Sequence, residues 1–115
     1  MSKREWKLFV EDILESIELI ESYVANMNFD NFKNDRKTID AVVRNLEIIG
    51  EAARNISDEI KNKYQNVDWK GMIGLRNRIA HGYFGINLTI IWEILKQELP
   101  PLKEKMKQIK ELEGG

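Results

Sequence analysis

The chain has 115 residues, of which 43% are hydrophobic, and its 18 basic and 19 acidic side chains give a formal net charge of -1. This length fits one folding unit, so we predict a single domain over residues 1–115. The near balance of charge excludes a polycation that binds nucleic acid through bulk electrostatics. Any nucleic acid must therefore meet a local basic patch.

The chain contains no cysteine, which excludes disulfides, thiolate nucleophiles and thiolate metal sites. Its positively charged N-terminus runs into acidic residues rather than an apolar stretch, so no signal peptide is expected. No window approaches the roughly 18–20 apolar residues that a membrane span requires. The expected location is the cytoplasm.

Apolar residues that recur at three- and four-residue steps predict a first helix over residues 3–26. Residues 28–34 are rich in asparagine and aspartate, and we expect them to form a connector that Phe29 and Phe32 hold against the body. A second helix is expected over residues 36–56. It has apolar residues on two sides, which is typical of a central helix.

The polar residues of this second helix fall in one wedge, because steps of three, four and seven return to the same side of a helix. They are Arg44, Glu47, Glu51 and Asn55. One interpretation is a surface ion pair between Arg44 and Glu47, worth a few tenths of a kcal/mol. The other is that the wedge lines a groove near Arg76 and orients its side chain. The sequence leaves both open.

A short helix is expected over residues 58–64, followed by a helix over residues 69–81 that Asp68 caps. Gly71 and Gly74 lie inside this second helix. They lower its propensity and suggest close packing against another helix.

Asn87 is expected to cap a last helix, which Pro100 and Pro101 should bend or break before it continues over residues 102–112. Residues 113–115 are expected to fray. No strand-like alternation competes with these helices. The predicted fold class is therefore all-α, an antiparallel bundle of four to five helices.

The densest chemistry lies where Arg76 and His81, separated by four residues, are followed by Gly82 and Tyr83. Gly82 is expected to end the helix, so that His81, the only histidine, lies in the last turn, where the helix dipole favours a cation. A guanidinium binds phosphate oxygens bidentately and an imidazole moves protons, so the pair suits phosphodiester cleavage. Asn77 is a candidate to position the substrate or the histidine.

The Arg76-x-x-x-x-His81 pattern resembles the signature of the HEPN superfamily of small helical proteins, many of which are metal-independent ribonucleases. The extension to Tyr83 and the segment over residues 44–52, Arg-Asn-Leu-Glu-Ile-Ile-Gly-Glu-Ala, narrow the resemblance to the HepT branch. HepT is the toxin half of the HepT/MntA toxin-antitoxin pairs. The resemblance covers nearly the whole chain and implies an endoribonuclease that is a symmetric homodimer.

Within this reading Arg76, Asn77 and His81 are the catalytic residues, and Arg44, Glu47 and Glu51 are candidates to support them. No metal or other cofactor is expected, since one histidine and no cysteine do not make a standard zinc site. General acid and general base would be two copies of His81 that face a shared cleft in the dimer. Candidates to track the RNA phosphates are Lys61, Lys63, Lys70 and Arg78.

The HepT resemblance also implies that Tyr83 accepts an adenylyl group from an MntA-like nucleotidyltransferase, which silences the toxin. Two other functions stay open. The chain could be a non-catalytic nucleotide- or substrate-binding subunit that partners a nucleotidyltransferase. It could also be a purely structural helical dimer, in which Trp6, Trp69 and Trp92 are core or interface anchors.

Overall fold

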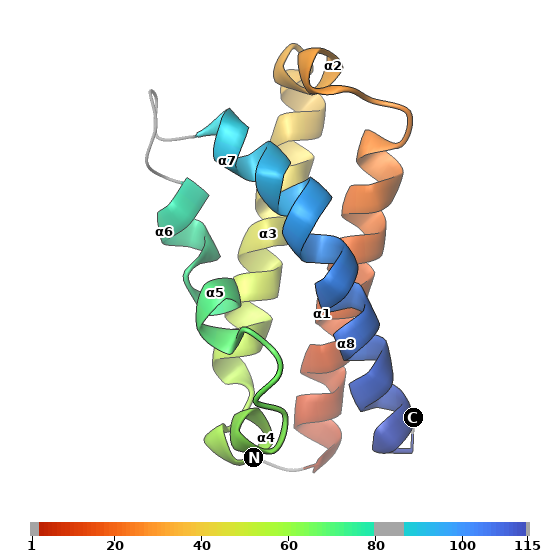
Figure 1. Ribbon diagram of the computed structural model, residues 1–115, viewed down its shortest axis with the longest axis vertical. Coiled ribbons are helices and arrows are strands. Elements are labelled where there is room, and N and C mark those ends of the chain that lie inside the picture. Colours follow the sequence, from red (N-terminus) through yellow and green to blue (C-terminus); the bar gives the residue numbers. More distant parts are fainter. Residues whose placement is uncertain (1–2, 80–86, 115) are drawn as a thin grey trace.

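The computed structural model describes residues 3–79 and 87–114, and every regular element in these two ranges is helical. The elements in chain order are α1 (Lys3–Val24), α2 (Phe29–Lys33), α3 (Arg36–Asn55), α4 (Asp58–Lys63), α5 (Trp69–Ile73), α6 (Leu75–Ile79), α7 (Leu88–Glu93), the π-helical η2 (Ile94–Glu98) and α8 (Leu99–Leu112). The long helices α1 and α3 run antiparallel and side by side (Figure 1). The predicted all-α bundle is therefore confirmed.

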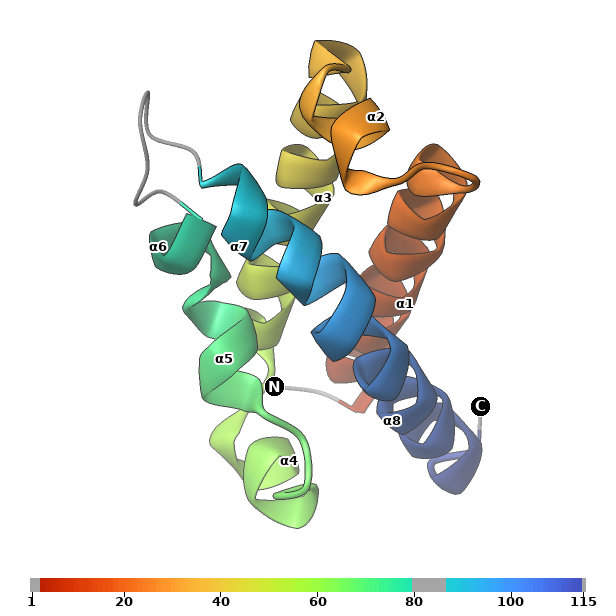
Figure 2. The same cartoon turned by 45° about the horizontal axis from the view of Figure 1, so that its top comes forward.

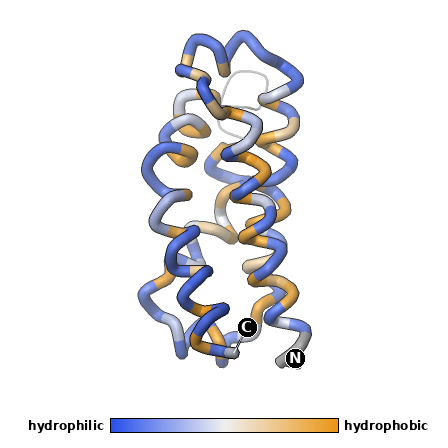
Figure 3. Tube along the Cα trace, turned by 90° about the vertical axis from the view of Figure 1, so that its right-hand side faces the viewer, coloured by the Kyte–Doolittle hydropathy of each residue, from blue (hydrophilic) through white to orange (hydrophobic). Residues whose placement is uncertain are grey.

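A third column, formed by α7, η2 and α8 in succession, crosses obliquely over α1 and α3 (Figure 2). Its lower part, α8, packs on α1, whereas α5 and α6 pack on α3. Apolar positions recur along each helix trace, interleaved with hydrophilic ones (Figure 3). This pattern is what a bundle with one shared core requires, because each helix buries one stripe and exposes the rest.

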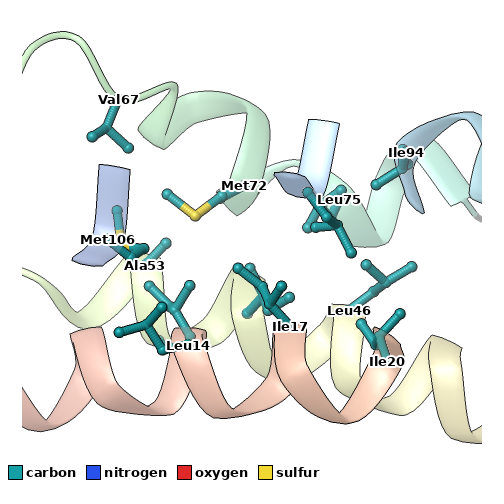
Figure 4. Packing of buried hydrophobic residues seen from close by; sticks show 14 of the residues in the cluster. Leu14, Ile17, Ile20, Leu46, Ala53, Val67, Met72, Leu75, Ile94 and Met106 are labelled. Atoms are coloured by element: carbon teal, nitrogen blue, oxygen red, sulfur yellow. The ribbon is translucent and has the colours of Figure 1, made fainter. Parts of the chain in front are cut away.

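The core lies between α1, α3 and the two helical layers that cover them. Met72 and Leu75 are buried and point from α5 and α6 toward side chains of α1 and α3, among them Ile17 (Figure 4). The apolar stripe predicted for the first helix faces the core. Its members on α1 are buried or half-buried: Trp6, Phe9, Val10, Ile13, Leu14, Ile17, Ile20 and Val24. None of the helices in the described ranges combines the length and the apolar character of a membrane span.

The segment predicted as a plain connector contains the short helix α2. Asn28 begins this helix through a reciprocal capping box with Asn31, in which each side chain accepts from the other residue's backbone N–H. Phe32 is fully buried, and its ring centroid lies 5.2 Å from that of Trp92. The expected docking by Phe29 and Phe32 is thus present, with a helical turn in place of a loop.

The prediction of one continuous helix over residues 69–81 is wrong at Gly74, where the chain divides into α5 and α6. Asp68 caps α5 as predicted, because its Oδ1 accepts from the Gly71 N–H at 3.0 Å. Gly74 ends α5 with φ -82° and ψ 0°, a bridge conformation between helix and strand. The predicted helix end at His81 and Gly82 lies outside the described residues.

The close helix packing expected of Gly71 and Gly74 is made by Gly50 instead. A Cβ added to Gly50 would stand 2.9 Å from the backbone oxygen of Met72, so α3 and α5 touch through their backbones here. A Cβ on Gly71 would meet the capping side chain of Asp68, and one on Gly74 would meet the Lys70 carbonyl of its own turn. Neither of these glycines lies against a second helix.

The bend or break expected at Pro100 and Pro101 is a change of helix type rather than an end of the helix, since α8 begins at Leu99 and carries both prolines in its first turn. The preceding turn is π-helical, and the Leu99 N–H donates to the carbonyl of Ile94, five residues back. A proline lacks an N–H and its ring crowds the carbonyl four residues earlier. The wider π turn accommodates both effects without interrupting the helix.

Glu113, which lies two residues before the C-terminus and was expected to fray, is held by several contacts. Its carboxylate accepts from the Tyr64 hydroxyl and from Lys63 Nζ at 2.6 Å, and its backbone carbonyl accepts from Lys7 Nζ at 2.6 Å. These contacts fasten the end of α8 to α1 and α4. Burial of the Tyr64 hydroxyl, together with its hydrogen bond to Glu113, raises the pKa of that tyrosine.

Candidate functional site

Arg76, on α6, lies across from α3 and pairs loosely with Glu47. Its Nε lies 4.0 Å from Oε2 of Glu47, which is an ion-pair distance but too long for a hydrogen bond. The Arg76 side chain is 82% exposed. Within residues 3–79 and 87–114 it makes no hydrogen bond, so its five N–H donors are available to a ligand.

The contact between Arg76 and Glu47 lies on a groove of about 280 Å³ between α3 and the motif helices. The α3 wall of the groove consists of Arg44, Glu47, Gly50, Glu51 and Arg54, and the facing wall consists of Ile73 and Arg76. Three guanidiniums therefore surround two carboxylates.

The structure brings together Arg76 and the three candidate supporting residues, Arg44, Glu47 and Glu51. The alternative surface pair of Arg44 with Glu47 is absent from the part of the chain that the structure describes, where the ion pair of Glu47 is with Arg76. Asn55, the fourth member of the predicted wedge, lies outside the groove and donates to the Glu51 carbonyl of its own helix.

Sequence reasoning missed Arg54, which lines the groove in the place expected for Asn55. Spacing alone could not have chosen it. At about 100° per residue, Arg54 and Asn55 lie at opposite edges of the helix face that Arg44, Glu47 and Glu51 share, and the groove selects the edge that carries Arg54.

The structure does not bring Asn77 into the groove, and this residue is exposed. His81 and Tyr83 lie outside the described residues. The segment that carries them is bounded by Ile79 and Asn87, and the Asn87 N–H donates to the Ile79 carbonyl at 2.9 Å. The side chain of Asn87 also caps α7 as predicted, accepting from the Ile90 N–H.

Arg78, a candidate phosphate contact, is already occupied. Both of its terminal nitrogens donate to the Glu98 carboxylate, at 2.8 and 2.5 Å. This bidentate hydrogen bonding raises the pKa of Arg78 and lowers the pKa of Glu98. Lys63 is similarly engaged with Glu113. Arg76 and Arg78 are two residues apart, yet of these two only Arg78 has its guanidinium hydrogen-bonded within the described ranges.

Comparisons with known proteins give one consistent family. The family model described as "Ribonuclease HepT-like" matches residues 13–109. A protein of Methanocaldococcus jannaschii named "Putative RNase" is 45% identical over 115 residues, covering 99% of this chain and 95% of that protein. A protein of Thermococcus cleftensis named "Probable ribonuclease HepT" is 40% identical over 108 residues, covering 94% of this chain and 98% of that protein. No solved structure matches the chain.

The family match spans most of the chain, from the middle of α1 to the last turns of α8, and both relatives are covered over nearly their whole length. It therefore includes the α3 segment and the α6 motif on which the resemblance depends. The chain belongs to the HepT-like family.

Proposed function

We propose that this protein is a metal-independent endoribonuclease toxin of a HepT/MntA-like pair, acting in the cytoplasm. The observation that carries the proposal is the exposed Arg76 guanidinium beside the α3 groove, which makes no hydrogen bond within the described ranges, in a chain whose relatives are named as ribonucleases. Such a guanidinium can bind the non-bridging oxygens of a phosphodiester bidentately. It also stabilises the negative charge that grows on them in the transition state.

The proposed reaction uses the nucleophile that RNA itself supplies. The 2'-oxygen attacks the adjacent phosphorus, the bond from phosphorus to the 5'-oxygen breaks, and a 2',3'-cyclic phosphate forms. One imidazole takes the proton of the 2'-hydroxyl, and a second gives a proton to the leaving 5'-oxygen. The chain has one histidine, so we assign these roles to His81 of each protomer in a symmetric homodimer. Asn77 would position the substrate.

Glu47 acts in this scheme as a positioning residue. Its carboxylate lies 4.0 Å from the Arg76 guanidinium, close enough to attract the cation but not to occupy its donors. Arg44 and Glu51 flank this contact along α3. The pair thus holds Arg76 toward the groove while leaving it free to bind phosphate.

The proposed regulation is adenylylation of Tyr83 by a cognate MntA-like nucleotidyltransferase. The tyrosine oxygen attacks the α-phosphorus of ATP, pyrophosphate leaves, and the phenolic proton is lost to solvent. Two residues from His81, the bulky and anionic AMP group would block the cleft and repel RNA.

The nuclease proposal is tested with purified protein and RNA in the presence of a chelator. We expect cleavage to 2',3'-cyclic phosphate ends, lowered about 100-fold or more by His81→Ala or by Arg76→Ala. Arg36→Ala is the matched control, because Arg36 is an exposed arginine that pairs with Asp40 on α3. Cleavage by His81→Ala at the parent rate would overturn the mechanism. Nucleotide binding without cleavage would favour the binding-subunit alternative.

The dimer and the modification have their own tests. Light scattering should give twice the mass of the single chain, and a monomer that cleaves RNA would contradict the shared-cleft mechanism. Incubation with the nucleotidyltransferase and ATP should add AMP to Tyr83, as seen by mass spectrometry. Tyr23, which is partly exposed on α1, is an internal control. An AMP group on Tyr23 as often as on Tyr83 would contradict a specific site.

A further inference from the structure

The groove lining also includes a third arginine, Arg54, which lies farther along α3 than the Arg76 contact. The proposed reaction does not use this residue. Arg54 is exposed, near the C-terminal end of α3. It lies three residues beyond Glu51 and seven beyond Glu47, on the face that forms the groove wall.

Arg44 and Arg54 differ from most other arginines of the bundle in having no ion pair or hydrogen bond within the described ranges. Arg36 pairs with Asp40 at 3.0 Å, and Arg78 pairs with Glu98 at 2.5 Å. The groove thus contains two arginines, Arg44 and Arg54, that no carboxylate of the described ranges pairs with, beside Arg76 and its ion pair with Glu47. It also contains two carboxylates, so it is not a uniform basic patch.

The spacing of these charges fits a strand of nucleotides. Arg44 and Arg54 are ten residues apart on one helix, which is about 15 Å along the helix axis. Arg54 lies about 10 Å along that axis from Glu47, the level at which Arg76 contacts α3. The rise of about 3.4 Å per nucleotide is measured along a duplex axis, and neighbouring phosphates of one strand lie farther apart than this, so the distance corresponds to about one to three nucleotides.

We propose that Arg54 binds a backbone phosphate of single-stranded RNA about one to three nucleotides from the phosphate held at Arg76. The proposal rests on the function proposed above and adds a second contact to it. The groove between α3 and the motif helices has a volume of about 280 Å³, which is too small to enclose a duplex, whereas the backbone of one strand can cross it. Arg54 is therefore a binding residue, distant from the reacting atoms.

The carboxylates between the arginines set how the strand lies. Glu47 and Glu51 repel phosphates, so the phosphates stay at the arginines. Ribose 2'-hydroxyls and base amino groups are hydrogen-bond donors, and they can turn toward the carboxylates. The alternation of charge along α3 thereby selects a ribose strand in one register.

The test measures binding separately from cleavage. In a His81→Ala background, a fluorescent single-stranded RNA of mixed sequence is titrated at several salt concentrations, and its anisotropy gives the affinity. Loss of one phosphate contact should reduce the slope of log K against log salt by about 0.7. We expect this reduction in Arg54→Gln. The control Arg36→Gln, from the same helix, should keep the parent slope, and Arg54→Lys should largely restore it.

Equal slopes for the parent and Arg54→Gln would overturn the proposal, as would equal losses in Arg54→Gln and Arg36→Gln. Cleavage assays with His81 intact provide the second readout. Arg54→Gln should raise KM for longer oligonucleotides and leave kcat unchanged. If the parent cleaves no RNA but the slope depends on Arg54, the nuclease proposal fails and the phosphate site stands. If the parent cleaves RNA and neither the slope nor KM changes in Arg54→Gln, the phosphate site at Arg54 fails and the nuclease proposal stands.

Discussion

The Glu47 carboxylate lies 4.0 Å from the Arg76 guanidinium, across the interface between α3 and α6. At this distance the attraction between unit charges is about 1 kcal/mol in water, and the guanidinium keeps its donors. Segments 29 residues apart in the chain thereby meet at one groove.

Replacing Glu47 with Gln should therefore weaken catalysis without abolishing it. Loss of about 1 kcal/mol of orienting attraction corresponds to a fall of about fivefold in kcat/KM, well short of the loss in Arg76→Ala. Because Glu47 acts through Arg76, the two changes should not add in a double-mutant cycle. Steady-state kinetics of the single and double variants measure this coupling, and fully additive effects would show that Glu47 does not act through Arg76.

The contact of Gly50 with the Met72 carbonyl predicts a steric cost for Gly50→Ala. The added methyl would stand 2.9 Å from that oxygen, so α3 and α5 must separate slightly. Overpacking of this kind lowers the free energy of unfolding by about 1–3 kcal/mol. Chemical denaturation measures it. Lys37→Ala, an exposed change on the same helix, should stay within about 0.5 kcal/mol of the parent. Equal stability of Gly50→Ala and the parent would show that α3 and α5 can separate at this contact without a cost in the free energy of unfolding.

The Arg78 and Glu98 pair predicts a dependence of stability on acid. Bidentate hydrogen bonding lowers the pKa of Glu98 below its ordinary 4.5, so the pair stabilises the fold above that pH. The contribution is lost as pH falls below 4.5 and the carboxylate takes up a proton. Both side chains are partly exposed, so it is under about 1 kcal/mol. Glu98→Gln should unfold less steeply with acid than the parent. An identical acid profile would contradict this role.

The Tyr64 hydroxyl predicts the opposite pH dependence. Its pKa is raised by burial and by the hydrogen bond to Glu113, so the folded state holds the phenolic proton more tightly. This stabilisation is present below the ordinary pKa of 10.0 and is lost as pH rises through the folded value. Glu113→Gln should lower the pKa of Tyr64, measured by tyrosinate absorbance, while Tyr64→Phe identifies the transition. An unchanged titration would show that Glu113 does not influence this hydroxyl.

Local signals in the sequence were enough to place most helices and their caps. Asp68 and Asn87 cap their helices through contacts three residues away, which a spacing rule can recognise. The division at Gly74 was not predictable in this way, because glycine permits several conformations and the packing of α5 and α6 on α3 selects one. The helix through Pro100 was missed because a π turn is a rare solution that depends on the surrounding core.

The candidate site shows the same division. Arg76 and the polar face of α3 were identified from motif and periodicity, but their contact depends on how two helices are rotated against each other. The engagement of Arg78 by Glu98 depends on a residue twenty positions later in η2. Charge in the sequence does not reveal whether a partner has already neutralised it. Arg54 was overlooked because Asn55, one position later, fitted the same approximate step.

The π turn at η2 also fixes the rotational setting of one helical column. One residue more or fewer rotates everything beyond it by about 100°. If α8 kept its packing on α1, deleting a single residue between Ile94 and Glu98 would rotate α7 and break its contacts with neighbouring elements. Trp92 would then leave Phe32, and Asn87 would leave Ile79. The additional residue in the π turn therefore couples two distant contacts. One is the packing of α8 on α1, and the other is the hydrogen bond between Asn87 and Ile79, three residues after Arg76.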